Sequence, residues 1–78
     1  MPLFRVETVH QTVEVSAMRA VDDGRDIIFE TPQTPGVWRS QYRVPAREVV
    51  KITRRVNEVS GAIAWITERP LVLGGTGA

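Results

Sequence analysis

The stretch YRVPAREVVKITRRV, from Tyr42 to Val56, decides the fold because it fits two incompatible secondary structures. As a helix opened by Pro45, it separates an apolar stripe from a charged face, and Gly61 suits the position just past the helix end. As two strands that meet at Pro45, it alternates apolar and polar residues with one break, at Arg54. The pattern of this stretch alone favours the helix.

The composition of the chain favours strands instead. Val, Ile and Thr make up 24 of the 78 residues, whereas leucine occurs only at Leu3, Leu71 and Leu73. Side chains that branch at Cβ fit a pleated strand better than a helix, and six residues between Ala46 and Ser60 are of this kind.

The N-terminal half predicts antiparallel strands. In TVEVSAMRAV, apolar Val13, Val15 and Ala17 alternate with polar neighbours, and DDGR then supplies the Asp-Gly chemistry of a hairpin turn. The following DIIFET places Ile27 and Phe29 on one face. A further strand is expected from residue 3 to residue 9.

A third meandering strand is expected after the loop TPQTPG. VWRSQYRV puts one set of residues on one face, namely Trp38, Ser40, Tyr42 and Val44. Three such strands are most simply closed by another pair, VVKITRRV and AIAWITER, around NEVSG. We therefore predict an all-β fold over residues 1–70, a small antiparallel meander or partly closed SH3-like barrel of five to six strands, with residues 71–78 as a flexible Gly-rich tail.

Seven residues, VPAREVV from Val44 to Val50, resemble the single turn between the last two strands of SH3-like and Sm-like barrels. The resemblance implies a shape only, because the aromatic ligand-binding cluster of the SH3 family and the Gly-Asn or Gly-Asp motif of Sm proteins are both missing. The alternative fold is α+β, with three strands, a helix over residues 45–60 and a C-terminal strand. In topology that alternative resembles the arm-binding domains of tyrosine recombinases, but the acidic N-terminal half argues against their DNA-binding function.

Composition and motifs limit the function. The chain is 42% apolar and 24% charged, and it has neither a run of about 18 apolar residues nor a secretory signal, so we expect a cytoplasmic protein of bacterial type without membrane contact. The absence of cysteine excludes disulfides and thiolate chemistry. His10 is the single histidine, the acidic group from Asp22 to Glu30 lacks the spacing of a calcium loop, and GGTGA ends the chain without a following helix. We expect no enzyme, no cofactor, no metal and no small-molecule substrate.

Charge is unevenly distributed along the chain. Residues 1–38 carry a net charge of −3 and residues 39–78 carry +4. On the strand interpretation, outward positions form a predicted basic patch that suits phosphate groups: Arg39, Arg43, Lys51 and Arg55, with Gln41 and Thr53 between them. The other interpretations of these cations are ion pairing with the acidic half of the same molecule and docking of an acidic protein.

The C-terminal strand, residues 62–68, gives the favoured hypothesis. Ile63 and Trp65 lie on one face and Ala64 and Ile66 on the other, so one small core cannot cover both. Neither Pro nor Lys protects this edge before Pro70. We predict a non-catalytic protein-interaction or self-assembly module with contact residues Ile63, Trp65 and Ile66, and the alternative is a small nucleic-acid-binding module. In a third interpretation Trp65 closes the monomer's own core and PLVLGG covers the edge.

Overall fold

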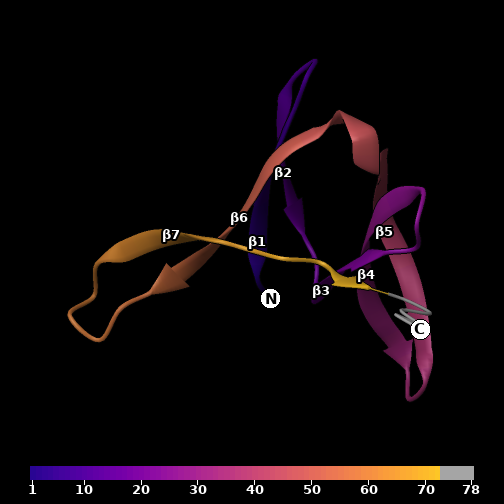
Figure 1. Ribbon diagram of the computed structural model, residues 1–78. Helices are drawn as coiled ribbons and strands as arrows, with labels where there is room; N and C mark the ends of the chain where they lie inside the picture. The colour runs from indigo at the N-terminus through magenta and orange to yellow at the C-terminus, as the bar shows by residue number, and fades with distance from the viewer. Residues whose placement is uncertain (73–78) are drawn as a thin grey trace.

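A computed structural model of the protein describes residues 1–72, which form two four-stranded sheets (Figure 1). One sheet has the strand order β2-β1-β6-β7 and the other has the order β5-β4-β3-β8. The elements are β1 (Leu3–Thr8), β2 (Thr12–Ser16), β3 (Arg19–Asp22), β4 (Asp26–Thr34), β5 (Val37–Pro45), the 3-10 turn η1 (Ala46–Glu48), β6 (Val49–Asn57), β7 (Ile63–Thr67) and β8 (Leu71–Val72).

The predicted all-β fold is confirmed, and the alternative helix over residues 45–60 is wrong. β5 ends at Pro45, and the single turn η1 leads directly into β6, as the resemblance to small barrels implied, but β5 and β6 are not the last two strands because β7 and β8 follow. Strand alternation places Val44 and Ile52 in the core. Burial of these side chains and pairing along β6 outweigh the helical pattern of the charged residues between them.

The structure has eight strands instead of five to six. One cause is that the predicted strand through Ala17 is two strands, because the chain changes sheets there. The backbone N–H of Ala17 donates to the carbonyl oxygen of Pro2 (3.1 Å), whereas the N–H of Met18 donates to that of Glu30 in the other sheet (2.8 Å). β2 and β3 therefore join the two sheets at a corner where Ala17 is buried and Met18 is exposed.

The other cause is β8, which lies in the predicted tail. Leu71 and Val72 pair in parallel with Val21 and Asp22 of β3, so the ladder extends two residues beyond the predicted end of the domain at residue 70. This parallel pair of strands departs from the predicted antiparallel meander. The rest of the predicted tail, residues 73–78, lies outside the described residues.

The core fills the space between the two sheets. Phe29 is fully buried at its centre, with its ring 5.3 Å from that of Phe4 in an edge-to-face arrangement and 6.1 Å from that of Tyr42. The buried cluster comprises Phe4, Val6, Val15, Ala17, Ala20, Ile27, Phe29, Val44 and Ile52. The predicted shared face of Ile27 and Phe29 is confirmed.

A β-bulge changes the predicted face of Trp38. Phe29 pairs with Tyr42 but Glu30 pairs with Ser40, so Gln41 is an extra residue that reverses the alternation. Trp38 therefore lies on the opposite face from Tyr42. The Arg19 guanidinium sits 3.6 Å above the Trp38 ring, on the outer face of the sheet.

The β3–β4 turn is held by a carboxylate. Asp23 accepts hydrogen bonds from the backbone N–H groups of Asp26 (2.8 Å) and Arg25 (2.9 Å). These two bonds, helped by the charges of Arg43 and Arg25, lower the pKa of Asp23 below its ordinary value of 3.8. Gly24 takes the left-handed conformation that this turn requires, with φ at 96°.

The Asp23 turn predicts a specific pH dependence. Since the pKa of Asp23 is lower in the folded state, its contribution to stability is present above pH 4 and is lost as the pH falls through the folded pKa. In Asp23→Asn the side-chain carbonyl can still accept both bonds, so we expect its free energy of unfolding to change less between pH 5 and pH 2 than that of the wild type. Urea unfolding at each pH measures this, and equal pH profiles for the two proteins would contradict it.

Candidate functional site

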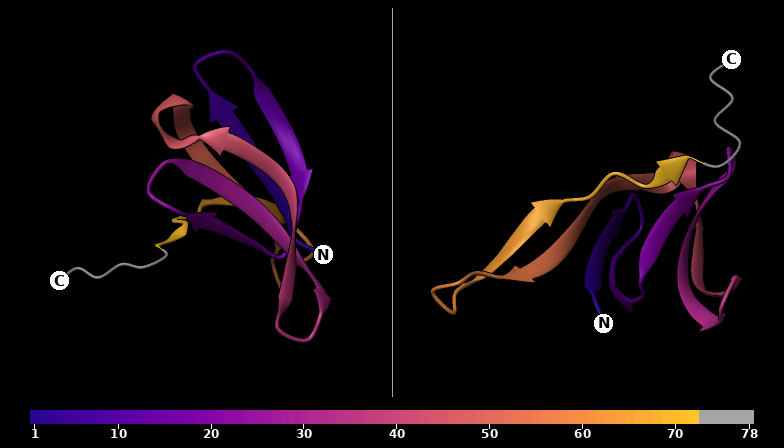
Figure 2. Two further views of the ribbon diagram at one scale, coloured as in Figure 1. Left: turned by 90° about the vertical axis from the view of Figure 1, so that its right-hand side faces the viewer. Right: turned by 90° about the horizontal axis from the view of Figure 1, so that it is seen from below.

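The hairpin of β6 and β7 extends beyond the rest of its sheet, away from the β4–β5 side of the molecule (Figures 1 and 2). β1 pairs with β6 only as far as Phe4 opposite Arg54. From Arg55 to Asn57, β6 pairs with β7 alone. The outer half of the hairpin is therefore a two-stranded ribbon, which has little independent stability in water.

Apolar side chains of β7 are exposed on both faces of this ribbon. Cross-strand pairing places Trp65 opposite Arg55 on the outer face, and Ala64 opposite Val56 on the face that continues the core. Ile63 on the outer face is 59% exposed, and Ile66 on the inner face is 42% exposed. The predicted division of the strand between two faces is confirmed, and the folded chain covers neither face completely.

Trp65 lies outside the core cluster and is half-buried. The Arg5 guanidinium is 3.9 Å from the centre of its ring, and Arg5 also forms an ion pair with Glu14 (3.1 Å). The interpretation in which Trp65 closes the monomer's own core is therefore wrong. The indole belongs to the outer surface of the sheet.

The outer edge of β7 presents backbone groups that have no partner within residues 1–72. The N–H of Glu58 donates to the carbonyl oxygen of Ala62 (2.7 Å), and the N–H of Glu68 donates to that of Ile52 (2.9 Å). Hydrogen-bonded and non-hydrogen-bonded pairs alternate along an antiparallel ladder, so the even-numbered residues of β7 bond to β6. The odd-numbered residues direct their N–H and C=O groups away from β6, and these are Ile63, Trp65 and Thr67.

No strand within residues 1–72 covers these groups. β7 is an edge strand of its sheet, and the segment after it pairs as β8 with β3 in the other sheet. The described part of PLVLGG therefore does not hide the edge, contrary to that interpretation.

β7 differs from the three other edge strands. β2 carries Glu14, β5 carries Arg39, Arg43 and a terminal proline, and β8 has only two residues. β7 has five residues, IAWIT, without a charge or a proline. Charges, prolines and short length are the features that protect an edge from pairing with another chain, and β7 has none of the three.

The predicted basic patch does not form one surface. The bulge at Gln41 places Arg39 and Arg43 on opposite faces of β5, and Lys51 and Arg55 lie on β6 in the other sheet. Arg43 forms ion pairs with Asp26 (2.8 Å) and Asp23 (3.7 Å), as the interpretation of intramolecular pairing predicts. Thr53, predicted to point outward between Lys51 and Arg55, is buried. Its cross-strand neighbours are Arg5 and Thr67.

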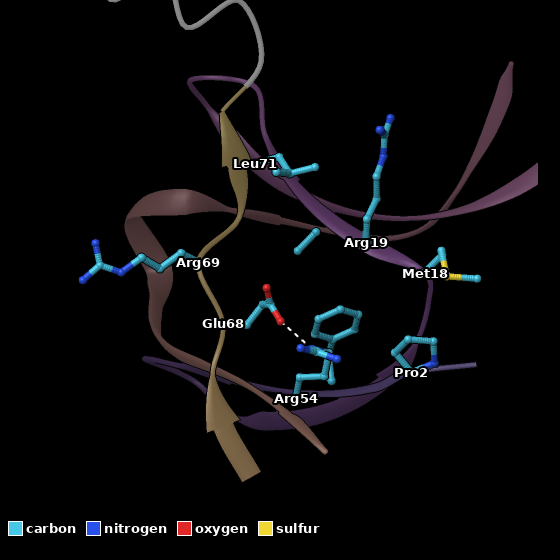
Figure 3. Close-up of a pocket in the computed structure, with 9 residues that line it drawn as sticks. Pro2, Met18, Arg19, Arg54, Glu68, Arg69 and Leu71 are labelled. Carbon is cyan, nitrogen blue, oxygen red and sulfur yellow. Dashed lines mark hydrogen bonds and ion pairs between the residues drawn. The ribbon is translucent and has the colours of Figure 1, made fainter. Parts of the chain in front are cut away.

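A cavity of about 220 Å³ lies between the sheets at the base of the hairpin (Figure 3). Arg54 and Glu68 form an ion pair of 2.6 Å in its wall, and Figure 3 shows the side chains of Arg19 and Arg69 directed away from its centre. The carboxylate of the cavity is thus already neutralised by the arginine nearest to it. Sequence reasoning missed the cavity because its lining comes from four different strands and their flanking residues.

His10 lies in the β1–β2 turn, exposed, with its Nε2 atom 3.8 Å from a carboxylate oxygen of Glu48.

Within residues 1–72 there is no helix of the length and hydropathy needed to cross a membrane. Comparison of the chain with protein-family models found no matching family, and searches of curated proteins and of solved structures found no significant match.

Proposed function

We propose that the protein is a non-catalytic protein-interaction module of the cytoplasm that accepts an extended strand along the free edge of β7. The observation that supports this proposal is the uncharged edge strand with outward backbone groups at Ile63, Trp65 and Thr67. A partner strand would complete the ladder and cover the apolar side chains of Ile63 and Ile66.

Strand addition uses two sources of affinity. Backbone hydrogen bonds contribute about 1 kcal/mol each after exchange with water, and burial of apolar side chains adds about 25 cal/mol per Å² removed from water. The alternating side chains of the two strands then select the partner. On β7 both faces are apolar at the edge, so a partner strand with apolar residues on both faces fits best.

A proline at Thr67 tests the edge directly. Thr67→Pro removes one outward N–H group and leaves the bonds between β6 and β7 intact, because the Thr67 N–H is not part of that ladder. A fluorescein-labelled peptide with the sequence of residues 62–68 serves as the strand probe. We expect saturable binding in fluorescence anisotropy to the wild type and to Thr67→Ala, and at least tenfold weaker binding to Thr67→Pro.

The alanine variant is the matched control because it loses the same side chain and keeps the N–H group. Equal peptide binding by Thr67→Pro and Thr67→Ala would place the site elsewhere, and absence of peptide binding by the wild type would overturn the proposal. Circular dichroism verifies that both variants keep their strand content.

Nucleic-acid binding, the alternative function, now rests on fewer cations. Lys51 and Arg55 share the outer face of their sheet with Arg5, whereas Arg39 and Arg43 belong to the other sheet. Anisotropy with a labelled oligonucleotide tests it, since binding to phosphates weakens steeply with salt. Salt-sensitive binding that disappears in Lys51→Glu with Arg55→Glu would support it over strand addition.

A further inference from the structure

We infer that the strand accepted by β7 is β7 of a second copy, and that the two copies form a two-fold symmetric pair centred on Trp65. This inference rests on the proposed function and identifies the partner. It is carried by the positions of the free backbone groups, the side chains opposed across the symmetric pairing and the charges next to it.

The free backbone groups select the register. In an antiparallel pair, two residues exchange both hydrogen bonds only if both direct their N–H and C=O groups toward each other. Ile63, Trp65 and Thr67 do so on each copy. When Trp65 opposes Trp65 of the second copy, Ile63 opposes Thr67, and all six outward-directed residues are paired. Moving the axis to Ala64 or Ile66 leaves one such residue of each copy without a partner.

The side chains fit the same register. Ala64 then opposes Ile66 of the second copy on the inner face, so a small residue meets a large one at both symmetric positions. On the outer face Ile63 opposes Thr67, and the two indoles are direct neighbours. No pair in the interface joins like charges, because IAWIT is uncharged. A self-complementary patch of this kind is the requirement of a two-fold interface.

The charges beside the paired strands also agree. Continuation of the register places residues 61 and 62 of one copy opposite residues 69 and 68 of the other. The exposed Arg69 of one copy therefore lies opposite Gly61, in the hairpin tip that carries Glu58 of its partner copy, whereas Glu68 lies opposite Ala62 and is neutralised by Arg54 of its own copy (2.6 Å). With Glu68 neutralised, the attraction between Arg69 and the tip favours this orientation over a parallel one.

Cysteine cross-linking tests the register, and the chain suits this method because it has no cysteine of its own. Ala64 and Ile66 of the two copies would form a non-hydrogen-bonded pair with Cα atoms about 4.5 Å apart, which permits a disulfide. Two copies of Ala64, or two copies of Ile66, would be diagonal neighbours about 7–8 Å apart. We expect a mixture of Ala64→Cys and Ile66→Cys chains to form the mixed disulfide dimer at least fivefold faster than either variant forms a dimer alone.

Val59→Cys is the control for random collisions, since Val59 is fully exposed at the hairpin tip and outside the pairing. Light scattering after size exclusion should give twice the monomer mass of 8.7 kDa for the wild type at high micromolar concentration. A strictly monomeric protein there, or homodimer disulfides that form as fast as the mixed one, would overturn the symmetric pair. If the peptide of residues 62–68 still binds in that case, strand addition stands and only the second copy is excluded; if the peptide also fails, both proposals fall.

Discussion

Phe29→Ala is expected to lower the free energy of unfolding by about 4 kcal/mol, the largest loss that we predict for a single truncation in this protein. The Phe29 ring is fully buried, with the ring of Phe4 from the opposite sheet on one side and that of its cross-strand neighbour Tyr42 on the other. The cavity left by the ring cannot close, because the hydrogen-bonded ladders hold the two sheets in place. A domain of 78 residues has a total stability of roughly 4–12 kcal/mol, so the variant loses a third or more of it.

Urea unfolding followed by circular dichroism measures this loss. Val37→Ala is the control, because Val37 is an exposed apolar residue of the same sheet, 48% exposed, and its truncation should cost about 0.5 kcal/mol or less. Similar losses for the two variants would show that the core does not lie between the sheets around Phe29.

Much of the fold could be predicted from local sequence. The Asp-Gly turn, the strand after it and the hairpin around NEVSG all depend on residues close together in the chain, and they form as expected, whereas the strand before the turn is divided at Ala17. The stretch from Tyr42 to Val56 needed the composition of the whole chain, because its helical pattern is real but weaker than the preference of its branched residues for strands.

The remaining features depend on long-range pairing. The bulge at Gln41 reverses the faces of Trp38 and Arg39, and no residue type in VWRSQYRV indicates it. β8 forms because Leu71 pairs with Val21 of β3, in the sheet that does not contain β7, a contact across 50 positions of the chain. A period-2 pattern assumes an unbroken strand and a fixed partner, so it cannot reveal either feature.

The candidate site divides in the same way. The alternation of Ile63, Trp65 and Ile66 is local and was predicted correctly, whereas the basic patch required β5 and β6 to be neighbours in one sheet. The chain order of these two strands suggested a hairpin, but η1 carries the chain from one sheet to the other. The outward direction of the odd-numbered β7 residues could not be predicted at all, because it depends on the register that the turn from Glu58 to Ala62 imposes.

Ile66→Glu is expected to raise the dissociation constant of the symmetric pair by about 100-fold or more while leaving the monomer folded. Two-fold symmetry places the new carboxylate in the interface twice, each time opposite Ala64 of the other copy. A loss of about 1.4 kcal/mol at each position, modest for a carboxylate taken out of water next to apolar groups, already gives 100-fold.

The monomer should tolerate the same substitution. Ile66 is 42% exposed there, so the new carboxylate stays hydrated, and its cross-strand partner on β6 is Arg54, a nearby positive charge that already pairs with Glu68. Unchanged circular dichroism and a midpoint of urea unfolding close to that of the wild type at low protein concentration would verify this.

Val59→Glu separates the position of the charge from the charge itself. It adds the same carboxylate to the same hairpin, but Val59 lies in the turn between β6 and β7, outside the paired edge, and beside Glu58 the new charge faces the Arg69 segment of the other copy, which it does not repel. Sedimentation equilibrium over a range of concentrations should give a dissociation constant within about threefold of the wild type for Val59→Glu and at least 100-fold higher for Ile66→Glu. Equal weakening by both variants would mean that net charge controls association, and no weakening by Ile66→Glu would remove β7 from the interface. A dissociation constant that rises with a glutamate at position 66 and not at position 59, seven residues earlier on the same hairpin, is expected only if the interface lies on the edge of β7.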